Sequence, residues 1–218
     1  MTTLNDSPTD RNQPGEARHI TIRRAHPTER AAALPLAEAF SDDPVMATFV
    51  PAGPDRRRRL ENLFWAMLRS GPLQSGSTDV AVDERGTVVG TAAWEAPHTG
   101  REPILPTVEQ IPNYVRALGL RGSIAALRHR AVLQRPRPRL PHWYLAEIGV
   151  SSAARGFGVG TLLLEHRLEL IDHTRDAAYL ESSTERNRAL YRRHGFVELG
   201  IIEGLPSGAP MAMWRPRR

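Results

Sequence analysis

The chain has 218 residues, enough for one domain with a substantial core, and its 40% hydrophobic and 24% charged residues are typical of globular proteins. It contains no cysteine, which excludes disulfides, thiolate metal sites and thiol nucleophiles, and no apolar run reaches the roughly 18 residues of a membrane span. The formal net charge is +5, and arginine supplies the basic residues because lysine is absent.

Runs of arginine occur at DRRRRLE, RPRPR and RPRR, without interleaved aromatic residues and without the spacing of a zinc finger or a basic zipper. We expect no nucleic acid as the main partner, because a modestly basic surface suits a polyanionic small ligand equally well. Residues 1–18 have almost nothing to bury and predict a flexible tail before one domain over residues 19–218. The tail lacks the apolar core of a secretory signal, which favours a cytoplasmic protein with no membrane partner.

The first half of the domain predicts a strand, helices and a hairpin. Ile20 and Ile22 alternate with polar residues as in a short strand. An alanine- and leucine-rich helix is expected over Pro27–Phe40, kinked or divided by Pro35 and ended by SDDP at Pro44. The next helix has one apolar stripe, made of Leu60, Leu63, Phe64, Met67 and Leu68. TDVAVDERGTVVGTAAWEAP then contains two β-rich runs around the turn sequence DERG.

The second half alternates strands and helices. Two helical segments are expected within Thr107–Gln134, interrupted at Gly119 and Gly122, followed by the extended, proline-stiffened RPRPRLP. HWYLAEIGV predicts a strand, which leads through glycines into a helix ending near Asp172. AAYLESS is a strand, ERNRALYRRHG is a short helix closed by Gly195, and FVELGIIEG and APMAMWRP are the last two strands. This order indicates an α/β layer structure.

The glycine turn RGFGVG, residues 155–160, joins a strand to a helix, which is the usual way to offer backbone N–H groups to a phosphate. A P-loop needs Gly-Lys-[Ser/Thr] and is excluded because the chain has no lysine. The dinucleotide fingerprint needs a third glycine where Leu163 stands, and a tighter turn than SSAAR allows. Glu181 ends the next strand, as a ribose-binding acid does, so a nicotinamide enzyme stays an open alternative.

The remaining pattern, [Arg/Gln]-x-x-Gly-x-[Gly/Ala], resembles that of the GNAT superfamily of N-acetyltransferases. WYLAEIGVSSAARGFGVG, YLESS and NRALYRRHGF together are most similar to the puromycin N-acetyltransferase branch. The resemblance spans roughly Ile20 to Pro216 and is strongest from Trp143 onward. It implies a single α/β domain with a mixed, mostly antiparallel central sheet flanked by helices on both faces. It also implies an enzyme that moves the acetyl group of acetyl-CoA, without a metal, to the amine of a small molecule. The sequence leaves the acceptor open among an antibiotic-like nucleoside, a polyamine, an amino acid and a protein terminus.

The resemblance assigns coenzyme binding to the end of one strand, the glycine turn and the following short helix. These residues are Ile148, Gly149, Val150, Arg155, Gly156, Phe157, Gly158, Val159, Gly160, Thr161, Asn187 and Tyr191. The turn amides would hold the pyrophosphate, and the N–H of Val150 would polarise the thioester carbonyl. Asn187 would bond the pantetheine arm, with helix capping as its alternative. Tyr191, one helical turn later, would protonate the coenzyme thiolate, with core packing as its alternative.

Glu147 is the only acid within HWYLAEIGV, and burial there would raise its pKa toward the range of a general base. Glu181 is the second candidate base, and a salt bridge to an arginine is the alternative for both. Asp42 and Asp43 are candidates for attracting a cationic amine, although paired acids after a helix are commonly solvated caps. His142 is expected to be structural.

Aromatic residues are candidates for lining the acceptor pocket, with simple core packing as their alternative. They are Phe40, Phe49, Trp94 and Trp143. A catalytically silent acetyl-CoA-binding or regulatory module on the same fold is the alternative function, and the oligomeric state is left open.

Overall fold

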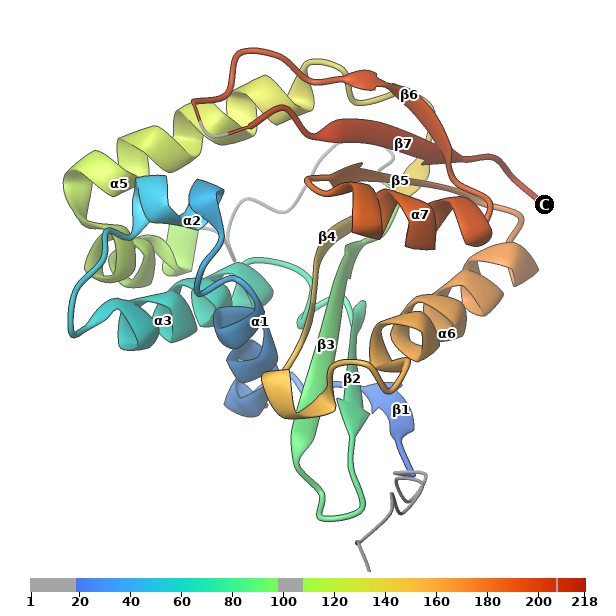
Figure 1. Cartoon of the computed structure of the whole chain (residues 1–218), viewed down its shortest axis with the longest axis horizontal. Coiled ribbons are helices and arrows are strands. Elements are labelled where there is room, and N and C mark those ends of the chain that lie inside the picture. Colours follow the sequence, from blue (N-terminus) through green and yellow to red (C-terminus); the bar gives the residue numbers. More distant parts are fainter. Residues whose placement is uncertain (1–18, 98–107, 207) are drawn as a thin grey trace, which may run out of the picture.

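The computed structural model describes residues 19–97, 108–206 and 208–218 (Figure 1). The tail predicted over residues 1–18 lies outside the described residues. Within the described ranges, no helix is both long enough and apolar enough to cross a membrane.

One sheet runs through the described part of the chain, in the order β1-β2-β3-β4-β5-β7-β6. Its strands are β1 (Thr21–Arg24), β2 (Thr78–Val82), β3 (Val88–Glu95), β4 (His142–Val150), β5 (Ala177–Ser182), β6 (Val197–Ile201) and β7 (Met211–Arg215). Only β4 and β5 pair in parallel, joined by a helical crossover, and the other neighbours pair antiparallel. The predicted mixed, mostly antiparallel sheet is confirmed.

Helices cover both faces of the sheet (Figure 1). One layer contains the short 3₁₀ helix η1 (Arg30–Ala32) with α1 (Ala33–Ala39), α2 (Pro44–Phe49), α3 (Arg56–Arg69) and α5 (Ile111–Gln134). On the other side lie α6 (Val159–His173) and α7 (Glu185–Arg193), preceded by the 3₁₀ turn η2 (Ser152–Ala154). The two larger hydrophobic cores follow this division, since one packs α1, α2, α3 and α5 and the other packs α6 and α7.

The expected effects of two prolines and one glycine were wrong. Pro35 lies in the first turn of α1, where its missing N–H has no intrahelical partner, so it does not divide the helix. Pro44 begins α2 rather than ending a helix, and Asp43 caps it by accepting hydrogen bonds from the next amides at 2.8 and 3.0 Å. In α5 only Gly119, with φ 66° and ψ 176°, breaks the helix. Gly122 is instead a close contact, because a Cβ there would lie 2.6 Å from the carbonyl oxygen of Phe49.

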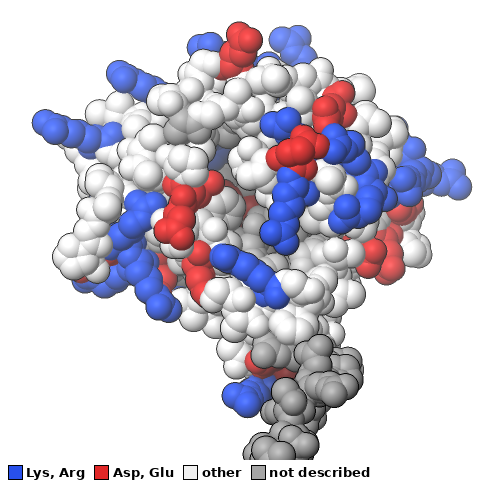
Figure 2. Space-filling model, viewed as in Figure 1, with Lys and Arg blue, Asp and Glu red and all other residues white. Residues whose placement is uncertain are grey.

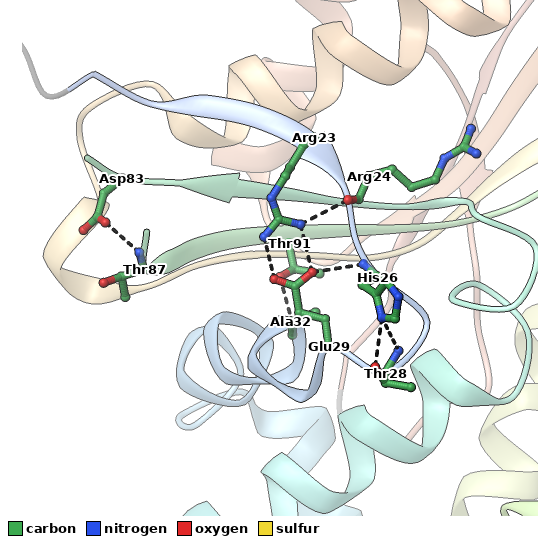
Figure 3. Close-up of polar contacts among 9 residues, drawn as sticks. All are labelled: Arg23, Arg24, His26, Thr28, Glu29, Ala32, Asp83, Thr87 and Thr91. Atoms are coloured by element: carbon green, nitrogen blue, oxygen red, sulfur yellow. Dashed lines mark hydrogen bonds and ion pairs between the residues drawn. The ribbon is translucent and has the colours of Figure 1, made fainter. Parts of the chain in front are cut away.

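A network of polar contacts fixes the entry to α1 (Figure 3). Arg23 donates to both carboxylate oxygens of Glu29, at 2.6 and 2.9 Å, and the backbone N–H of His26 donates to the same carboxylate. Thr91 on β3 donates through its hydroxyl to the carbonyl of Ala32 at 2.8 Å. These bonds hold the start of α1 against the sheet, so that the helix passes directly over β4.

A buried ion pair ties α6 to β2. Arg167 donates through Nε and Nη2 to the two carboxylate oxygens of Asp79, both at 2.7 Å, and the side chains are only 4% and 1% exposed. The pair is bidentate, the geometry in which arginine and carboxylate interact most strongly. It therefore fixes the position of the helix that follows the glycine turn.

We expect Arg167→Leu to lower the free energy of unfolding by about 3–5 kcal/mol, because it leaves the charge of Asp79 buried with only His166 near it, at 3.9 Å. Urea titration followed by circular dichroism measures the loss. The double variant Asp79→Asn with Arg167→Leu has no buried carboxylate at this position, so it should recover part of the free energy of unfolding that the single variant loses. A double variant as unstable as the single variant would contradict this account of the pair.

Candidate active site

The glycine turn has the backbone geometry that its sequence predicted. Gly156 and Gly158 have φ angles of 85° and 75°, in the left-handed region where a side chain strains the backbone. Gly158 is the N-cap of α6, and no side chain caps the helix. The first turn of α6 contains no acidic residue. The first amides of the helix lack intrahelical partners and carry its positive dipole, so this turn is a suitable anion site.

Beyond their first residues, β4 and β5 separate. Their pairing extends only from His142 to Tyr144 on β4, although β4 continues to Val150. Over that remaining length β4 pairs with β3 on its other side. The register shifts there between Ala93 and Trp94, which leaves Ala146 without an opposite residue, as in a β-bulge. The edge of β4 that faces β5 is therefore open.

The direction of the β4 amides follows from this pairing. Ser151 donates its N–H to Val89 on the β3 side at 2.9 Å, and Gly149 lies opposite Thr91. Successive N–H groups of a strand point to opposite sides. The N–H groups of Ile148 and Val150 therefore point toward the open edge.

Gly149 has a packing role in the structure. A Cβ at this position would lie 2.9 Å from the Cβ of Ala39 and 3.1 Å from the Cα of Leu36. The glycine thus allows α1 to lie close to β4, and its pairing with β3 remains regular.

A cavity of about 810 Å³ lies at this separation and receives side chains from both faces of the sheet. Five of the predicted site residues line it, namely Glu147, Ile148, Glu181, Asn187 and Tyr191. Gly149, Val150 and the turn residues Arg155–Thr161 are not in its lining. The space-filling view shows a hollow near the centre of the molecule, with acidic and basic side chains around it (Figure 2). The structure therefore brings the predicted catalytic residues together and places the anion site apart from them along β4.

Tyr191 and Asn187 lie on α7 above the open edge. Thr184 caps this helix by accepting a hydrogen bond from the N–H of Asn187 at 3.2 Å, so the capping alternative for Asn187 is wrong and its exposed side chain is not used as a cap. Tyr191 is 5% exposed and packs edge-on against Phe196, with ring centroids 5.9 Å apart. Among the described residues its hydroxyl has no hydrogen-bond partner. Burial and the charge of Glu147 raise the pKa of Tyr191, which keeps the phenol protonated.

Glu147 is half-buried and makes no hydrogen bond or ion pair with any described residue, so a salt bridge does not explain it. Burial, reinforced by the charges of Asp43, Glu181 and Glu95, raises the pKa of this carboxyl to about 8. A carboxyl with this pKa exchanges its proton near neutral pH, as a general base must.

Glu181 is held more firmly than Glu147. Tyr144 donates its hydroxyl to the Glu181 carboxylate at 2.7 Å, and Arg137 lies over the Tyr144 ring at 4.1 Å. Burial raises the pKa of Glu181, while the Tyr144 hydrogen bond and the Arg137 charge oppose the rise. Of the two candidate bases, Glu147 is the one without a protein hydrogen bond among the described residues.

The aromatic candidates for the acceptor pocket divide into two groups. Phe40 and Phe49 line the cavity together with Asp43, whereas Asp42 is not in its lining. Trp94 is fully buried, and Trp143 lies under Arg167 at 5.4 Å, so both belong to the core and their expected place in the pocket was wrong.

His142 is structural, as expected, because its ring bonds to neighbouring residues. Nδ1 is 2.6 Å from the carbonyl of Leu140, and Nε2 accepts from Arg137 at 3.0 Å. The ring also packs against Tyr179 and Trp214.

Sequence reasoning missed much of the cavity wall, including the polar residues Glu95, Tyr114 and His129. Glu95 ends β3 opposite Tyr144, so an acid at the end of the strand next to β4 was an available signal. Tyr114 and His129 come from α5, whose position over the sheet no local motif reveals. Over the residues that the structure describes, no group of His, Asp and Glu side chains is arranged to hold a metal ion.

Comparisons with known proteins agree with this geometry. A family model described as acetyltransferase (GNAT) domain matches residues 117–198. A solved structure from Corynebacterium glutamicum ATCC 13032, described as histone acetyltransferase HPA2 and related acetyltransferase, is 31% identical with a TM-score of 0.72, over 91% of this chain and 97% of that one. Arylalkylamine N-acetyltransferase 2 from Aedes aegypti has a TM-score of 0.59 over 90% of this chain and 98% of that one. At 13% identity it shows the fold alone.

Among the curated relatives, 5-NmdU N-acetyltransferase of Pseudomonas phage PaMx11 is 36% identical over 66 residues. These residues are 30% of this chain and 47% of the relative, so the match spans about half the length of that protein.

We expect Glu147→Gln to make stability less dependent on pH. The unfolded carboxyl ionises near its ordinary pKa of 4.5 and the folded one near 8, so the wild type loses stability as the pH rises from 4.5 to 8. Glutamine does not ionise, so the variant should gain up to about 4 kcal/mol relative to the wild type between pH 5 and pH 8.

Urea titrations at several pH values measure this difference in the free energy of unfolding. Glu169→Gln, at an exposed position of α6, is the matched control and should leave the pH dependence unchanged. A constant difference between the Glu147→Gln variant and the wild type would show that Glu147 ionises in its ordinary range.

Proposed function

The chain belongs to the GNAT acetyltransferase family, and we propose that it moves an acetyl group from acetyl-CoA directly to the amine of a small molecule. One observation carries the proposal: the open edge of β4 leads from a helix N-terminus without a side-chain cap to a cavity that holds a carboxyl and a phenol, neither of which has a hydrogen-bond partner among the described residues. The narrower resemblance to the puromycin branch rests on the sequence motifs alone.

The proposed coenzyme site begins at the glycine turn. Amides from Gly156 to Thr161 would surround the pyrophosphate, and the missing side chains of Gly156 and Gly158 leave room for it. Arg155 adds a positive charge beside the turn. The pantetheine arm would then run along the open edge of β4. The N–H and C=O groups there are not bonded to β5, so they can form hydrogen bonds with an extended ligand as a neighbouring strand would.

The thioester lies at the end of this path, beside the cavity. The N–H of Ile148, a residue that lines the cavity, points into the gap and would donate to the thioester carbonyl, stabilising the negative charge that develops on oxygen during attack. The N–H of Val150, to which the sequence assigned this role, points the same way but lies nearer the glycine turn and outside the lining, where it would bond the arm. Asn187 has a free side chain on the opposite wall, suited to bond an amide of the arm.

The proton transfers of the reaction are assigned to two residues. The attacking amine forms the new N–C bond and loses a proton to the carboxylate of Glu147, directly or through water. The acetyl C–S bond breaks as the tetrahedral intermediate collapses, and Tyr191 donates its phenolic proton to the departing thiolate. Glu181, fixed by Tyr144, adds negative charge that favours the cationic amine and is the second candidate base.

The turn can be tested with added methyl groups. Gly158→Ala forces a side chain into a backbone with φ 75°, which should distort the amide array and weaken acetyl-CoA binding by more than about tenfold. Gly160→Ala adds the same methyl group where the nearest atom is 3.8 Å away and φ is not in the left-handed region, so binding should be unchanged. Isothermal titration calorimetry measures both affinities.

Gly86→Ala is the control for backbone strain. This residue lies in the β2–β3 turn with φ 77° and open space around it, so the substitution should cost similar stability but leave acetyl-CoA binding intact. Equal affinities for the Gly158→Ala variant and the wild type would remove the turn from the coenzyme site.

The general acid can be tested by Tyr191→Phe. The variant keeps the ring packing against Phe196 but loses the proton donor, so kcat should fall by about 10²–10⁴-fold while the affinity for acetyl-CoA stays the same. Tyr114→Phe removes a hydroxyl from the same cavity, one already bonded to Ser70 at 2.8 Å, and should lower kcat far less.

Acetylated amines, separated by liquid chromatography, report kcat for a panel of small amines. A Tyr191→Phe variant as active as the wild type would exclude the acid role. Tight acetyl-CoA binding with no acetylated product from any amine would favour the silent binding module.

A further inference from the structure

We infer that the acceptor is a monoamine with an extended apolar body, and not a polyamine or another acceptor with a second distant cation. This inference rests on the proposed function for the transfer step, but it concerns the shape and charge of the cavity itself. The cavity has one acidic end at the sheet and an apolar remainder under the helices of one face.

The acidic end is formed by four carboxyl groups that line the cavity: Asp43, Glu95, Glu147 and Glu181. The charges of Asp43, Glu95 and Glu181 all raise the pKa of Glu147, so the four carboxyl groups lie near one another. Arg137 lies 3.4 Å from Glu95, and its charge also acts on Glu181. The acids outnumber this arginine, so one ammonium group is attracted to the sheet end of the cavity, next to the open edge of β4.

The remainder of the cavity is apolar. Its wall consists mainly of side chains from α2, α3 and α5, including Met46, Phe49, Leu63, Met67, Leu118 and Leu127. Several of these belong to the hydrophobic core on this face, so the cavity continues the core rather than a polar surface. An alkyl chain or an aromatic ring attached to the amine gains affinity by leaving water there.

A second cation finds no favourable place on this apolar wall. The charged or titratable groups that α5 contributes are Tyr114, His129 and Arg130. Burial raises the pKa of Tyr114 and lowers the pKa of His129, so both side chains are neutral. Arg130 adds positive charge on the same side, and its charge acts on Tyr114. Among the described residues, Asp43 is the carboxylate whose charge reaches His129, and its Oδ1 already accepts hydrogen bonds from the amides of Val45 and Met46. A distant ammonium would therefore lose its hydration near a like charge without an unoccupied carboxylate beside it.

Two amines of equal length test the inference. Heptylamine and hexane-1,6-diamine differ only in the far end of the chain, which is a methyl group in one and an ammonium in the other. We expect kcat/KM for heptylamine to exceed that for the diamine by about tenfold or more at pH 8. Without any acetyl-CoA present, heptylamine should also raise the melting temperature of the protein more than the diamine does.

A charge placed on the apolar wall should change this preference. Leu127 lines the cavity from α5 and is 69% exposed, so Leu127→Glu should fold normally and give the distant ammonium a partner. The kcat/KM for heptylamine divided by that for the diamine should then fall about tenfold. Leu120→Glu adds the same charge to the same helix at a residue that is 74% exposed and outside the lining, and should leave the ratio unchanged.

The outcomes separate this inference from the proposed function. Acetylation of the diamine as fast as heptylamine by the wild type would overturn the inference while the acetyl transfer stands. A ratio that Leu127→Glu leaves unchanged, or that both variants change equally, would also overturn it. If neither amine is acetylated but heptylamine alone stabilises the protein, the cavity preference stands and the proposed transfer fails. If neither amine is acetylated and neither stabilises the protein, both fail.

Discussion

The separation of β4 from β5 after Tyr144 is the constraint on which the site depends. Each backbone N–H and C=O of a strand must find a partner, and β3 satisfies only one edge of β4. The other edge stays open from Leu145 to Val150, because β5 is paired with β7 on its far side and diverges from β4. An open edge inside a protein is a binding surface for an extended ligand.

The same separation accounts for the electrostatics. The gap in the sheet allows Glu147 from β4 and Glu181 from β5 to share one cavity with Asp43 and Glu95, where burial disfavours the charged forms of Glu147 and Glu181. Like charges at low dielectric raise the pKa of the group that lacks a hydrogen-bonding partner, and that group is Glu147. Glu181 instead receives the hydroxyl of Tyr144, so two acids of the same type differ in their readiness to exchange a proton.

Local sequence signals predicted the part of the site that is local in the chain. The glycine turn, the strand before it and the helix that contains Tyr191 were identified because glycine spacing and hydrophobic period act over a few residues. The effects of Pro35 and Pro44 were predicted wrongly. A proline can lie in the first turn of a helix or follow its end, and the local sequence alone does not tell which of these two places it takes. Trp94 was misplaced because the period of a strand does not tell which face lies against the core.

The acceptor half of the cavity was beyond sequence reasoning for a different physical reason. Its walls come from α2, α3 and α5, whose mutual position is set by contacts between distant segments, such as the approach of Gly122 to the Phe49 carbonyl at a Cβ distance of 2.6 Å. The matched family region, residues 117–198, contains β4, the glycine turn, α6 and α7 but none of α1, α2 or α3. The elements that would bind the coenzyme therefore lie where the chain resembles its family most. Of the helices that would choose the amine, α2 and α3 lie outside this region, and α5 lies within it from residue 117 onward.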